Sequence, residues 1–327
     1  MSRVFVAGAT GYIGQHVVRE LVARGHEVVC LARPRSGVDG RLDEDAVRAT
    51  LAGAEVRFGD VTSERSVRED GFRGEPFDAT FSCLATRTGE PRDAWAIEHE
   101  ANEHVLQAAA DVGCERFVLL SAICVQKPVL PFQRAKLAFE RSLQESGLTW
   151  SIVRPTAFFK SLAGQVGRVK AGKPFLVFGD GELTACKPIG ESDLARFMVD
   201  CLANPAKANA ILPIGGPGPA ITPKAQAELL FALLGQEPKI KRVPVALMSA
   251  IIGGLAAGGL FSAKLRAKAE LARIGRFYGT ESMLLWKDGR YDADATPSFG
   301  TETLRDFYER VLREGLAGQE LGDHAVF

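Results

Sequence analysis

The sequence lacks two features that would point to particular partners or cofactors: an excess of charge of one sign, and closely spaced cysteines. Forty basic residues balance forty acidic ones, so the net charge is zero and no general nucleic-acid-binding surface is indicated. The six cysteines include no C-x-x-C pair, a pattern typical of reduced thiols rather than disulfides, structural zinc or an iron–sulfur cluster. We therefore expect a cytoplasmic protein with no metal site of its own.

The sequence also shows no targeting segment and only one long apolar run. The first expected strand begins near Arg3, which leaves no room for a signal or transit peptide ahead of it. The apolar run, residues 245–261, contains four glycines and is short for a membrane span. We expect it to form buried core or a pocket wall; contact with a membrane surface or lipophilic substrate is the first alternative, and a spanning helix the last.

Alternating strand and helix patterns predict an α/β fold, a doubly wound parallel sheet of the Rossmann type. Expected strands cover 3–7, 27–31, 54–58, 79–83, 116–120 and 150–153, and expected helices cover 13–24, 41–51, 93–112 and 134–145. Beyond residue 154 the rhythm loosens, with short strands at 175–178, 186–189 and 211–214, a helix at 191–202 and another that Thr222 and Pro223 begin. We expect a Rossmann domain over residues 1–155 and a smaller α/β substrate lobe over 156–327.

The first strand leads into a glycine-rich turn that predicts a dinucleotide site. Residues 8–14 read Gly-Ala-Thr-Gly-Tyr-Ile-Gly, a G-x-x-G-x-x-G spacing. Gly8 would allow the tight turn, Gly11 would let the backbone approach a pyrophosphate, and Gly14 would let the helix pack on the strand. Thr10, Tyr12 and Ile13 belong to the same turn, whose N–H groups would face the phosphates. A turn that serves only helix packing is the alternative.

The residues after the second and third strands indicate which nucleotide binds. Arg33 stands where an NAD-specific site would hold a carboxylate, and a guanidinium matches a 2′-phosphate instead. Arg35 and Ser36 could add to that contact, so NADPH is the expected cofactor; solvated surface arginines are the alternative. Asp60 is placed to meet an adenine amino group, or else to cap the next helix.

Residues at three further strand ends complete the expected cofactor site. Small or apolar residues there would let the ribose and nicotinamide approach closely, although any parallel strand end can show them. The positions are Cys83, Leu84, Ala85, Ser121 and Pro155.

The segment Phe132 to Lys136 departs from the pattern of short-chain dehydrogenases. Those enzymes place Tyr-x-x-x-Lys here, where the tyrosine transfers a proton at a carbonyl or alcohol oxygen. Phe132 occupies the tyrosine position and has no such proton, so this chain either leaves carbonyls alone or does no chemistry. Lys136 remains a candidate for holding the ribose or relaying a proton, with a solvated lysine as the alternative.

Two adjacent aromatics, Phe158 and Phe159, follow the sixth strand and could stack on a flat ligand; core packing is equally consistent with them. His99 and His104 are five residues apart on a helix and do not share a face, which makes them a poor metal pair.

The first half of the chain resembles the atypical short-chain dehydrogenases of the isoflavone-reductase-like and NmrA-like groups. Motifs of the second half are similar to one family among them, the NADPH-dependent divinyl chlorophyllide 8-vinyl reductases. They are Cys124–Pro128 with Phe132–Lys136, Lys173–Phe175, Phe178–Ile189, Leu212–Gly218, Ile274–Tyr278, Ala295–Gly300 and Arg313–Gly322.

That resemblance implies reduction of the C8 vinyl group of 3,8-divinyl (proto)chlorophyllide a to ethyl, in chlorophyll or bacteriochlorophyll biosynthesis. The implied reaction delivers hydride to one vinyl carbon and a proton to the other, so the missing tyrosine is not fatal. Phe132, Phe158 and Phe159 would contact the planar tetrapyrrole, which carries its own magnesium. A phototrophic bacterium, with peripheral contact to its photosynthetic membrane, is the implied setting.

Other classes of function stay open. One is a non-catalytic NADP-sensing regulator of the NmrA type, which would also lack the tyrosine, and another is an assembly or scaffold protein built on an inactive dehydrogenase fold. Among enzymes, the alternative is an isoflavone-reductase-like enzyme that reduces another conjugated substrate.

Overall fold

The computed structural model describes residues 1–36, 40–86 and 89–315, and the chain divides into two compact units. The first unit contains residues 1–86, 91–155 and 191–212. The second contains 87–90, 156–190 and 213–327, as far as these are described. The motif residues 316–322 lie outside the described residues.

A seven-stranded sheet carries the first unit, in the order β3-β2-β1-β4-β5-β6-β8. Its strands are β1 (Arg3–Ala7), β2 (Glu27–Ala32), β3 (Glu55–Phe58), β4 (Ala79–Ser82), β5 (Arg116–Leu120), β6 (Thr149–Pro155) and β8 (Ala210–Ile214). Each pairing from β3 through β6 is parallel. The expectation of a doubly wound Rossmann sheet is confirmed, and the strand order reverses between β1 and β4, where such folds bind ligands.

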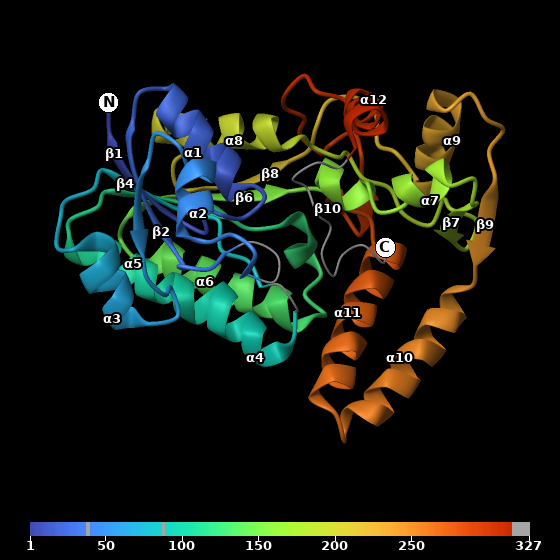
Figure 1. The fold of residues 1–327 in the computed structure, drawn as a ribbon, viewed down its shortest axis with the longest axis horizontal. Helices are drawn as coiled ribbons and strands as arrows, with labels where there is room; N and C mark the ends of the chain where they lie inside the picture. The colour runs from blue at the N-terminus through green and yellow to red at the C-terminus, as the bar shows by residue number, and fades with distance from the viewer. Residues whose placement is uncertain (37–39, 87–88, 316–327) are drawn as a thin grey trace. The chain divides into compact units, whose positions relative to one another are not determined.

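Helices cover both faces of this sheet, as Figure 1 shows. Those of the first unit are α1 (Gly14–Ala23), α2 (Glu44–Thr50), α3 (Glu64–Ser66), η2 (Val67–Phe72), α4 (Pro91–Ala94), η3 (Trp95–Glu100), α5 (Ala101–Asp111), η4 (Ile123–Gln126), α6 (Pro131–Glu145), α8 (Glu191–Val199), which η6 (Asp200–Leu202) continues, and η7 (Pro205–Lys207). Helices α1 and α8 pack together on one face, and α5 and α6 lie on the other. Beneath η2, the rings of Phe5 and Phe72 stack with centroids 3.9 Å apart.

The helix expected over residues 93–112 is present but not uniform. It runs as α4, then η3, a π-helical turn, and then α5. A π turn adds a residue to one helical turn and changes which side chains face the sheet, and such turns are frequent at functional sites.

The division into units differs from the expected single boundary after residue 155. Glu191–Leu212, expected in the substrate lobe, belong to the first unit. The physical reason is packing: α8 lies against α1, and the strand that follows it, β8, joins the sheet beside β6.

The second unit holds short elements around its own core. It contains η5 (Phe159–Leu162), α7 (Val166–Lys170), β7 (Phe175–Phe178), α9 (Pro223–Leu233), β9 (Ile240–Val243), α10 (Val245–Gly259), α11 (Ala263–Thr280), β10 (Leu285–Lys287), β11 (Arg290–Asp292) and α12 (Leu304–Glu314). Strands β7 and β9 pair in parallel, and β10 and β11 form an antiparallel hairpin. The prediction of a strand over residues 186–189 is wrong. Cys186 and Ile189 make isolated bridges only, because Pro188 lacks the N–H that would extend a ladder of hydrogen bonds.

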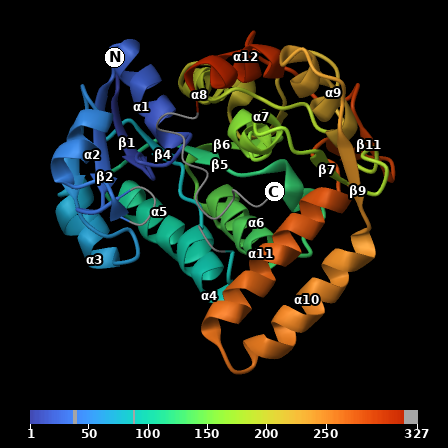
Figure 2. The same ribbon diagram turned by 45° about the vertical axis from the view of Figure 1, so that its right-hand side comes forward.

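The expectation that residues 245–261 are buried is also wrong. They form α10 and the turn after it, and α10 packs chiefly against α11, side by side with it in Figure 2. Contact with one neighbouring helix buries a single stripe, so only Ile252 and Gly259 of α10 are buried. No described helix is long and apolar enough to cross a membrane.

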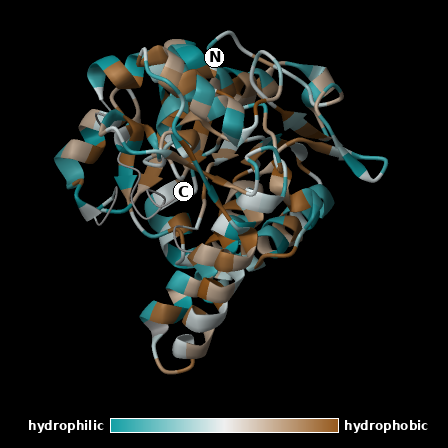
Figure 3. Cartoon of the chain, turned by 90° about the vertical axis from the view of Figure 1, so that its right-hand side faces the viewer, coloured by the Kyte–Doolittle hydropathy of each residue, from teal (hydrophilic) through white to brown (hydrophobic). Residues whose placement is uncertain are grey.

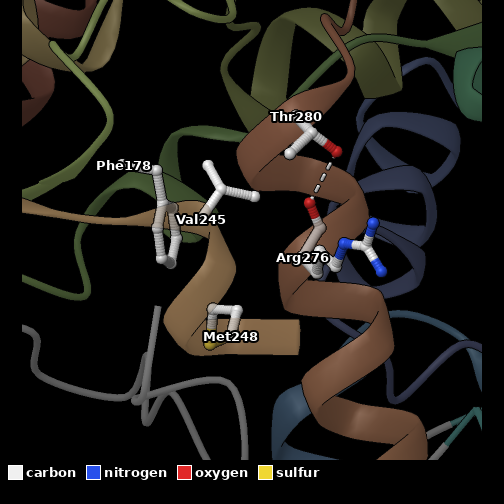
Figure 4. Close-up of a pocket in the computed structure, with 5 residues that line it drawn as sticks. All are labelled: Phe178, Val245, Met248, Arg276 and Thr280. Atoms are coloured by element: carbon white, nitrogen blue, oxygen red, sulfur yellow. Dashed lines mark hydrogen bonds between the residues drawn. The ribbon is translucent and has the colours of Figure 1, made fainter. Parts of the chain in front are cut away.

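Helices α10 and α11 form a helical hairpin, and its base is anchored where β7, α10 and α11 meet (Figure 4). Phe178, Val245 and Met248 form its apolar side, and the Thr280 hydroxyl donates to the Arg276 carbonyl at 2.9 Å. The hollow among these side chains has no room for a water molecule, so it is a packing contact rather than a ligand site.

Candidate functional site

The glycine turn after β1 shows the backbone geometry that its sequence predicts. Gly8 has φ of +75°, and a Cβ there would lie 2.6 Å from the Cys83 carbonyl. A Cβ at Gly14 would lie 2.1 Å from the Gly8 oxygen, so α1 can pack on the turn only without one. The turn therefore lies against the end of β4, at the point where the strand order reverses.

This turn fits the pyrophosphate of a dinucleotide. A Cβ at Gly11 would meet only two backbone atoms, the Gly8 oxygen at 3.1 Å and the Cys83 oxygen at 4.0 Å. No side chain of the described residues therefore covers the backbone at Gly11, and a phosphate can approach it. Ile13, the N-cap of α1, supplies no capping side chain, and the first turn of α1 carries no acidic residue. No acidic side chain of this first turn competes with a phosphate for the positive end of the α1 dipole.

The other residues of the turn have different surroundings. Ile13 is buried and Thr10 half-buried. The Tyr12 hydroxyl donates to Glu191 Oε2 at 2.7 Å, which ties the turn to the start of α8. Glu191 is a residue that sequence reasoning missed.

The cluster expected to bind a 2′-phosphate divides in two. Arg33 and Arg35 are exposed just past β2, consistent with contact to a phosphate. Ser36 is only 1% exposed; its hydroxyl donates to the Arg33 carbonyl at 3.0 Å, and its backbone pairs with Leu42. The expectation for Ser36 is therefore corrected: its groups close the loop that carries Arg33.

Asp60 does not cap the helix after β3. That cap is Ser63, whose side chain accepts from the backbone of Ser66. Asp60 Oδ1 instead accepts from the N–H and the hydroxyl of Thr62, at 2.9 and 2.8 Å. Its carboxylate is exposed after the strand, so contact with an adenine amino group stays a prediction.

The remaining strand-end residues are mostly buried. Leu84 belongs to the core, Ala85 is exposed, and Pro155 is buried at the end of β6. Ser121 is 3% exposed, and its hydroxyl donates to Glu140 Oε1 at 2.5 Å. Glu140 also pairs with Arg154, so the Ser121 hydroxyl is part of a buried polar network.

Lys136 is held in the first unit by an ion pair with Glu98. Its Nζ donates to Glu98 Oε2 at 2.6 Å, and the side chains of Lys136 and Glu98 are 10% and 2% exposed. Oε1 of Glu98 accepts from the Thr86 N–H at 2.9 Å. A buried charge pair is tolerated only where its groups are satisfied, so this arrangement fixes the position of the ammonium group.

The same ion pair lies close to the end of β4. Burial raises the pKa of the Cys83 thiol to about 12, and the positive charge of Lys136 acts in the opposite direction. Cys83 faces Gly8, and Glu98, the partner of Lys136, accepts from Thr86 four residues after β4, so the glycine turn and the ion pair both lie near the end of β4.

Glu98 was missed by sequence reasoning, although a signal existed. It lies on the buried face of its helix with Ala94, Ala101 and Val105, at helical spacing. A carboxylate on an apolar face needs a partner, but the sequence does not say which. Asn102 supports this helix: its amide donates to the Glu98 carbonyl at 3.1 Å, and its oxygen accepts from Ser82 at 2.5 Å.

The three aromatics expected to contact substrate differ in availability. Phe132 is 8% exposed and lies one turn before Lys136 on α6. Phe158 is half-buried in the second unit, where it makes a bridge with Ile189. The expectation for Phe159 is wrong: it is fully buried in the core of the second unit, 5.4 Å from the Phe307 ring centroid.

Metal-binding and thiol chemistry have little structural basis in the described residues. No group of three or more His, Cys, Asp or Glu side chains among them is placed to hold a metal ion. All six cysteines are buried, and burial also raises the pKa of Cys186 to about 12 and of Cys201 to about 11. A buried neutral thiol is a poor nucleophile.

Comparison with known proteins gives the family. Residues 8–205 match a family described as NAD(P)H-binding. The chain is 54% identical to the divinyl chlorophyllide a 8-vinyl-reductase of rice, over 99% of this chain and 82% of the relative, and 50% identical to that of Arabidopsis thaliana, over 98% and 79%. Among solved structures it resembles an NADPH-dependent quinone oxidoreductase of Escherichia coli in complex with NADPH, with a TM-score of 0.68, 16% identity, and coverage of 94% and 99%. The chain therefore belongs to the divinyl chlorophyllide a 8-vinyl-reductase family, oxidoreductases built on an NAD(P)H-binding domain.

Proposed function

We propose that this protein reduces the C8 vinyl group of 3,8-divinyl (proto)chlorophyllide a to ethyl, using NADPH. The observation that carries the proposal is the identity of 50–54% with four vinyl reductases over 98–100% of the chain. Phe132 supports it, because reduction of a carbon–carbon double bond leaves no oxygen for a tyrosine to protonate.

When bound, NADPH supplies a hydride to one vinyl carbon, and a proton must reach the other vinyl carbon to complete the ethyl group. The glycine turn and the N-terminus of α1 would hold the pyrophosphate of the bound cofactor. Asp60, Leu84, Ala85, Ser121 and Pro155 are proposed to line the path of its adenine, ribose and nicotinamide.

Lys136 is the proposed catalytic residue. Its ammonium group, fixed by Glu98, either holds the ribose or relays the proton. Glu98 is a positioning residue, since it acts through Lys136. Phe132, one helical turn before Lys136, is proposed to pack against the flat macrocycle, and contact of Phe158 with the substrate stays a separate prediction.

Arg33 and Arg35 are proposed to select NADPH over NADH. Both are exposed past the end of β2, where the 2′-phosphate of the adenosine would lie. A guanidinium binds phosphate by paired, charge-assisted hydrogen bonds that a hydroxyl cannot replace.

We also propose that the protein works in the cytoplasm of a phototrophic bacterium, in peripheral contact with the photosynthetic membrane. All six cysteines are buried and none is in a disulfide, which supports a reducing compartment.

The test is incubation of the purified protein with 3,8-divinyl chlorophyllide a and NADPH, with NADH in parallel, followed by chromatography, absorption and mass measurement. We expect a gain of two hydrogens with NADPH and little with NADH. NADPH binding without turnover would contradict the proposal and favour an NADP-sensing regulator. Reduction of another conjugated substrate, but not of this one, would favour an isoflavone-reductase-like enzyme.

The variant Phe132→Tyr separates vinyl reduction from carbonyl reduction. It restores the Tyr-x-x-x-Lys pattern, and we expect turnover of the vinyl substrate to change little. A large gain in turnover would contradict the role proposed for the phenylalanine.

A further inference from the structure

The turn between α10 and α11 exposes apolar side chains to an unusual degree. Leu260 is 78% exposed and Phe261 is 92% exposed. On α10 itself, Leu247 and Ile251 lie one helical turn apart and are 50% and 44% exposed. Figure 3 shows the turn at the far end of the hairpin from the rest of its unit, coloured as strongly hydrophobic. Two adjacent large apolar side chains that are almost fully exposed indicate a surface that binds an apolar partner.

The charge around this turn has one sign. Residues 245–269, which form α10, the turn and the start of α11, contain three basic side chains and no acidic one, although basic and acidic residues balance in the whole chain. These three, Lys264, Arg266 and Lys268, are exposed in the first two turns of α11, directly after Phe261. The first acidic residue, Glu270, is buried and paired with Arg273. We call Leu260 and Phe261, together with Lys264, Arg266 and Lys268, the hairpin tip. Its partner is therefore expected to be apolar and negatively charged.

The two helices approach closely beside the turn, which holds the tip in place. A Cβ at Gly258 would lie 2.7 Å from the Leu265 side chain, and one at Gly259 would lie 3.2 Å from the Arg266 Cα. A surface hollow of about 320 Å³ opens there, lined by Ala256, Gly259, Leu260, Arg266, Ala269 and Arg273. Apolar residues beside arginines suit a lipid phosphate with the start of its acyl chains.

We propose that this hairpin tip docks the protein on an anionic lipid surface. Leu260 and Phe261 enter the boundary between headgroups and acyl chains, while Lys264, Arg266 and Lys268 contact the headgroups. The inference deepens the membrane contact proposed above by naming its segment and its lipid class. It does not depend on the reductase activity.

A second copy of the hairpin fits less well as the occupant. Pairing two tips would bring their basic side chains together, and like charges oppose that contact. A lipid surface of opposite charge satisfies both the apolar and the basic side chains at once.

The experiment is flotation of the full-length protein with vesicles of phosphatidylcholine alone, or of phosphatidylcholine with an equal part of phosphatidylglycerol. We expect binding to the anionic vesicles that weakens as salt is raised, and little binding to the neutral ones. The variant Leu260→Ser/Phe261→Ser should lose most of this binding. The reversal Lys264→Glu/Lys268→Glu should weaken it at least roughly twenty-fold, since each basic residue near the surface contributes about fivefold.

The matched control is Leu183→Ser, which removes a leucine of the same unit that is 49% exposed and lies outside the hairpin. It should bind like the wild type. Equal binding of both tip variants and the wild type, or no binding of the wild type to anionic vesicles, would overturn the proposal. A wild-type dimer in lipid-free solution that the tip variants convert to monomer would overturn it in favour of a second copy. Turnover with water-dispersed substrate should persist in the tip variants, so a failure of the reductase proposal is seen separately.

Discussion

Two regions of the molecule depart from the usual distribution of side chains, in opposite directions. Around α6 the first unit buries charge, with Lys136 against Glu98 and Arg154 against Glu140. At the tip of the α10–α11 hairpin the second unit exposes apolar surface, with Leu260 and Phe261. The buried charges cost folding free energy because they lose hydration, whereas the exposed apolar groups contribute almost none because they gain no burial.

The two regions differ in what compensates for the unfavourable arrangement. The ion pairs are satisfied within the fold, so their value is a fixed position for Lys136 near the end of β4. The hairpin tip has no such internal compensation, so its value depends on what covers it. Departures of the first kind indicate chemistry at a defined atom, and those of the second kind indicate association.

The largest effect is expected from breaking the ion pair at one end. Lys136→Met leaves the Glu98 carboxylate buried without its cation and should lower the free energy of unfolding by about 3–5 kcal/mol. The double variant Lys136→Met/Glu98→Gln should recover much of that loss. Urea denaturation of both variants measures the free energy of unfolding. If Lys136→Met were as stable as the wild type, the buried ion pair would not contribute to stability.

The same two variants separate stability from chemistry. If Lys136 relays the proton, turnover should fall by about 10²–10⁴-fold in both of them, even where stability returns. Single-turnover measurement at saturating NADPH checks this. Turnover that recovers together with stability would show that the lysine serves the fold alone.

A second large effect is expected at the glycine turn. Gly14→Ala places a Cβ 2.1 Å from the Gly8 oxygen, a backbone atom that cannot move cheaply. We expect a loss of about 1–3 kcal/mol of stability together with weaker NADPH binding. Thermal unfolding and a fluorescence titration with NADPH measure the two effects.

The matched control is Gly167→Ala in α7, where an added Cβ meets nothing within 4 Å. It should leave stability unchanged or raise it slightly, because alanine favours helix. A loss as large as that of Gly14→Ala would mean that the close approach in the turn is not what matters.

A smaller effect is expected for Arg33→Ala. Loss of a charge-assisted hydrogen bond of about 1.5–3 kcal/mol should raise the KM for NADPH roughly ten- to hundred-fold and leave that for NADH unchanged. Steady-state kinetics with both nucleotides tests this. Arg65→Ala, at an exposed arginine of the same unit, is the control. An equal change for both nucleotides would exclude Arg33 from phosphate recognition.

The smallest effect on stability is expected at the hairpin tip. In lipid-free solution Leu260→Ser/Phe261→Ser should change the free energy of unfolding by no more than about 0.5 kcal/mol per site, because both side chains are mostly in water already. Phe307→Ala, in the core of the same unit, should cost about 3–5 kcal/mol. Denaturant titration of the two variants compares them, and a large loss at the tip would mean that it is structural.

Much of the first unit could be predicted from the sequence because its signals are local. The apolar run of β1, Gly8 and Gly14 specify a strand, a turn and a helix within a few residues of one another. The exact agreement of the expected strand 116–120 with β5 has the same origin. Pairs of residues distant in the sequence could not be predicted in this way: Glu98 and Lys136 are 38 residues apart, and Tyr12 and Glu191 are 179 apart.

The sequence by itself determined the Rossmann sheet, the glycine turn, the absence of the usual tyrosine and the family resemblance, since each depends on residue types at short spacings. Tertiary structure alone decided that Lys136 is paired, that Ser36 and Phe159 are enclosed, and that Glu191–Leu212 return to the first unit. It also decided that residues 245–261 are exposed. An apolar run in the sequence indicates only that its burial would be favourable. Whether it is buried depends on which elements pack beside it, and here α11 covers a single stripe of α10.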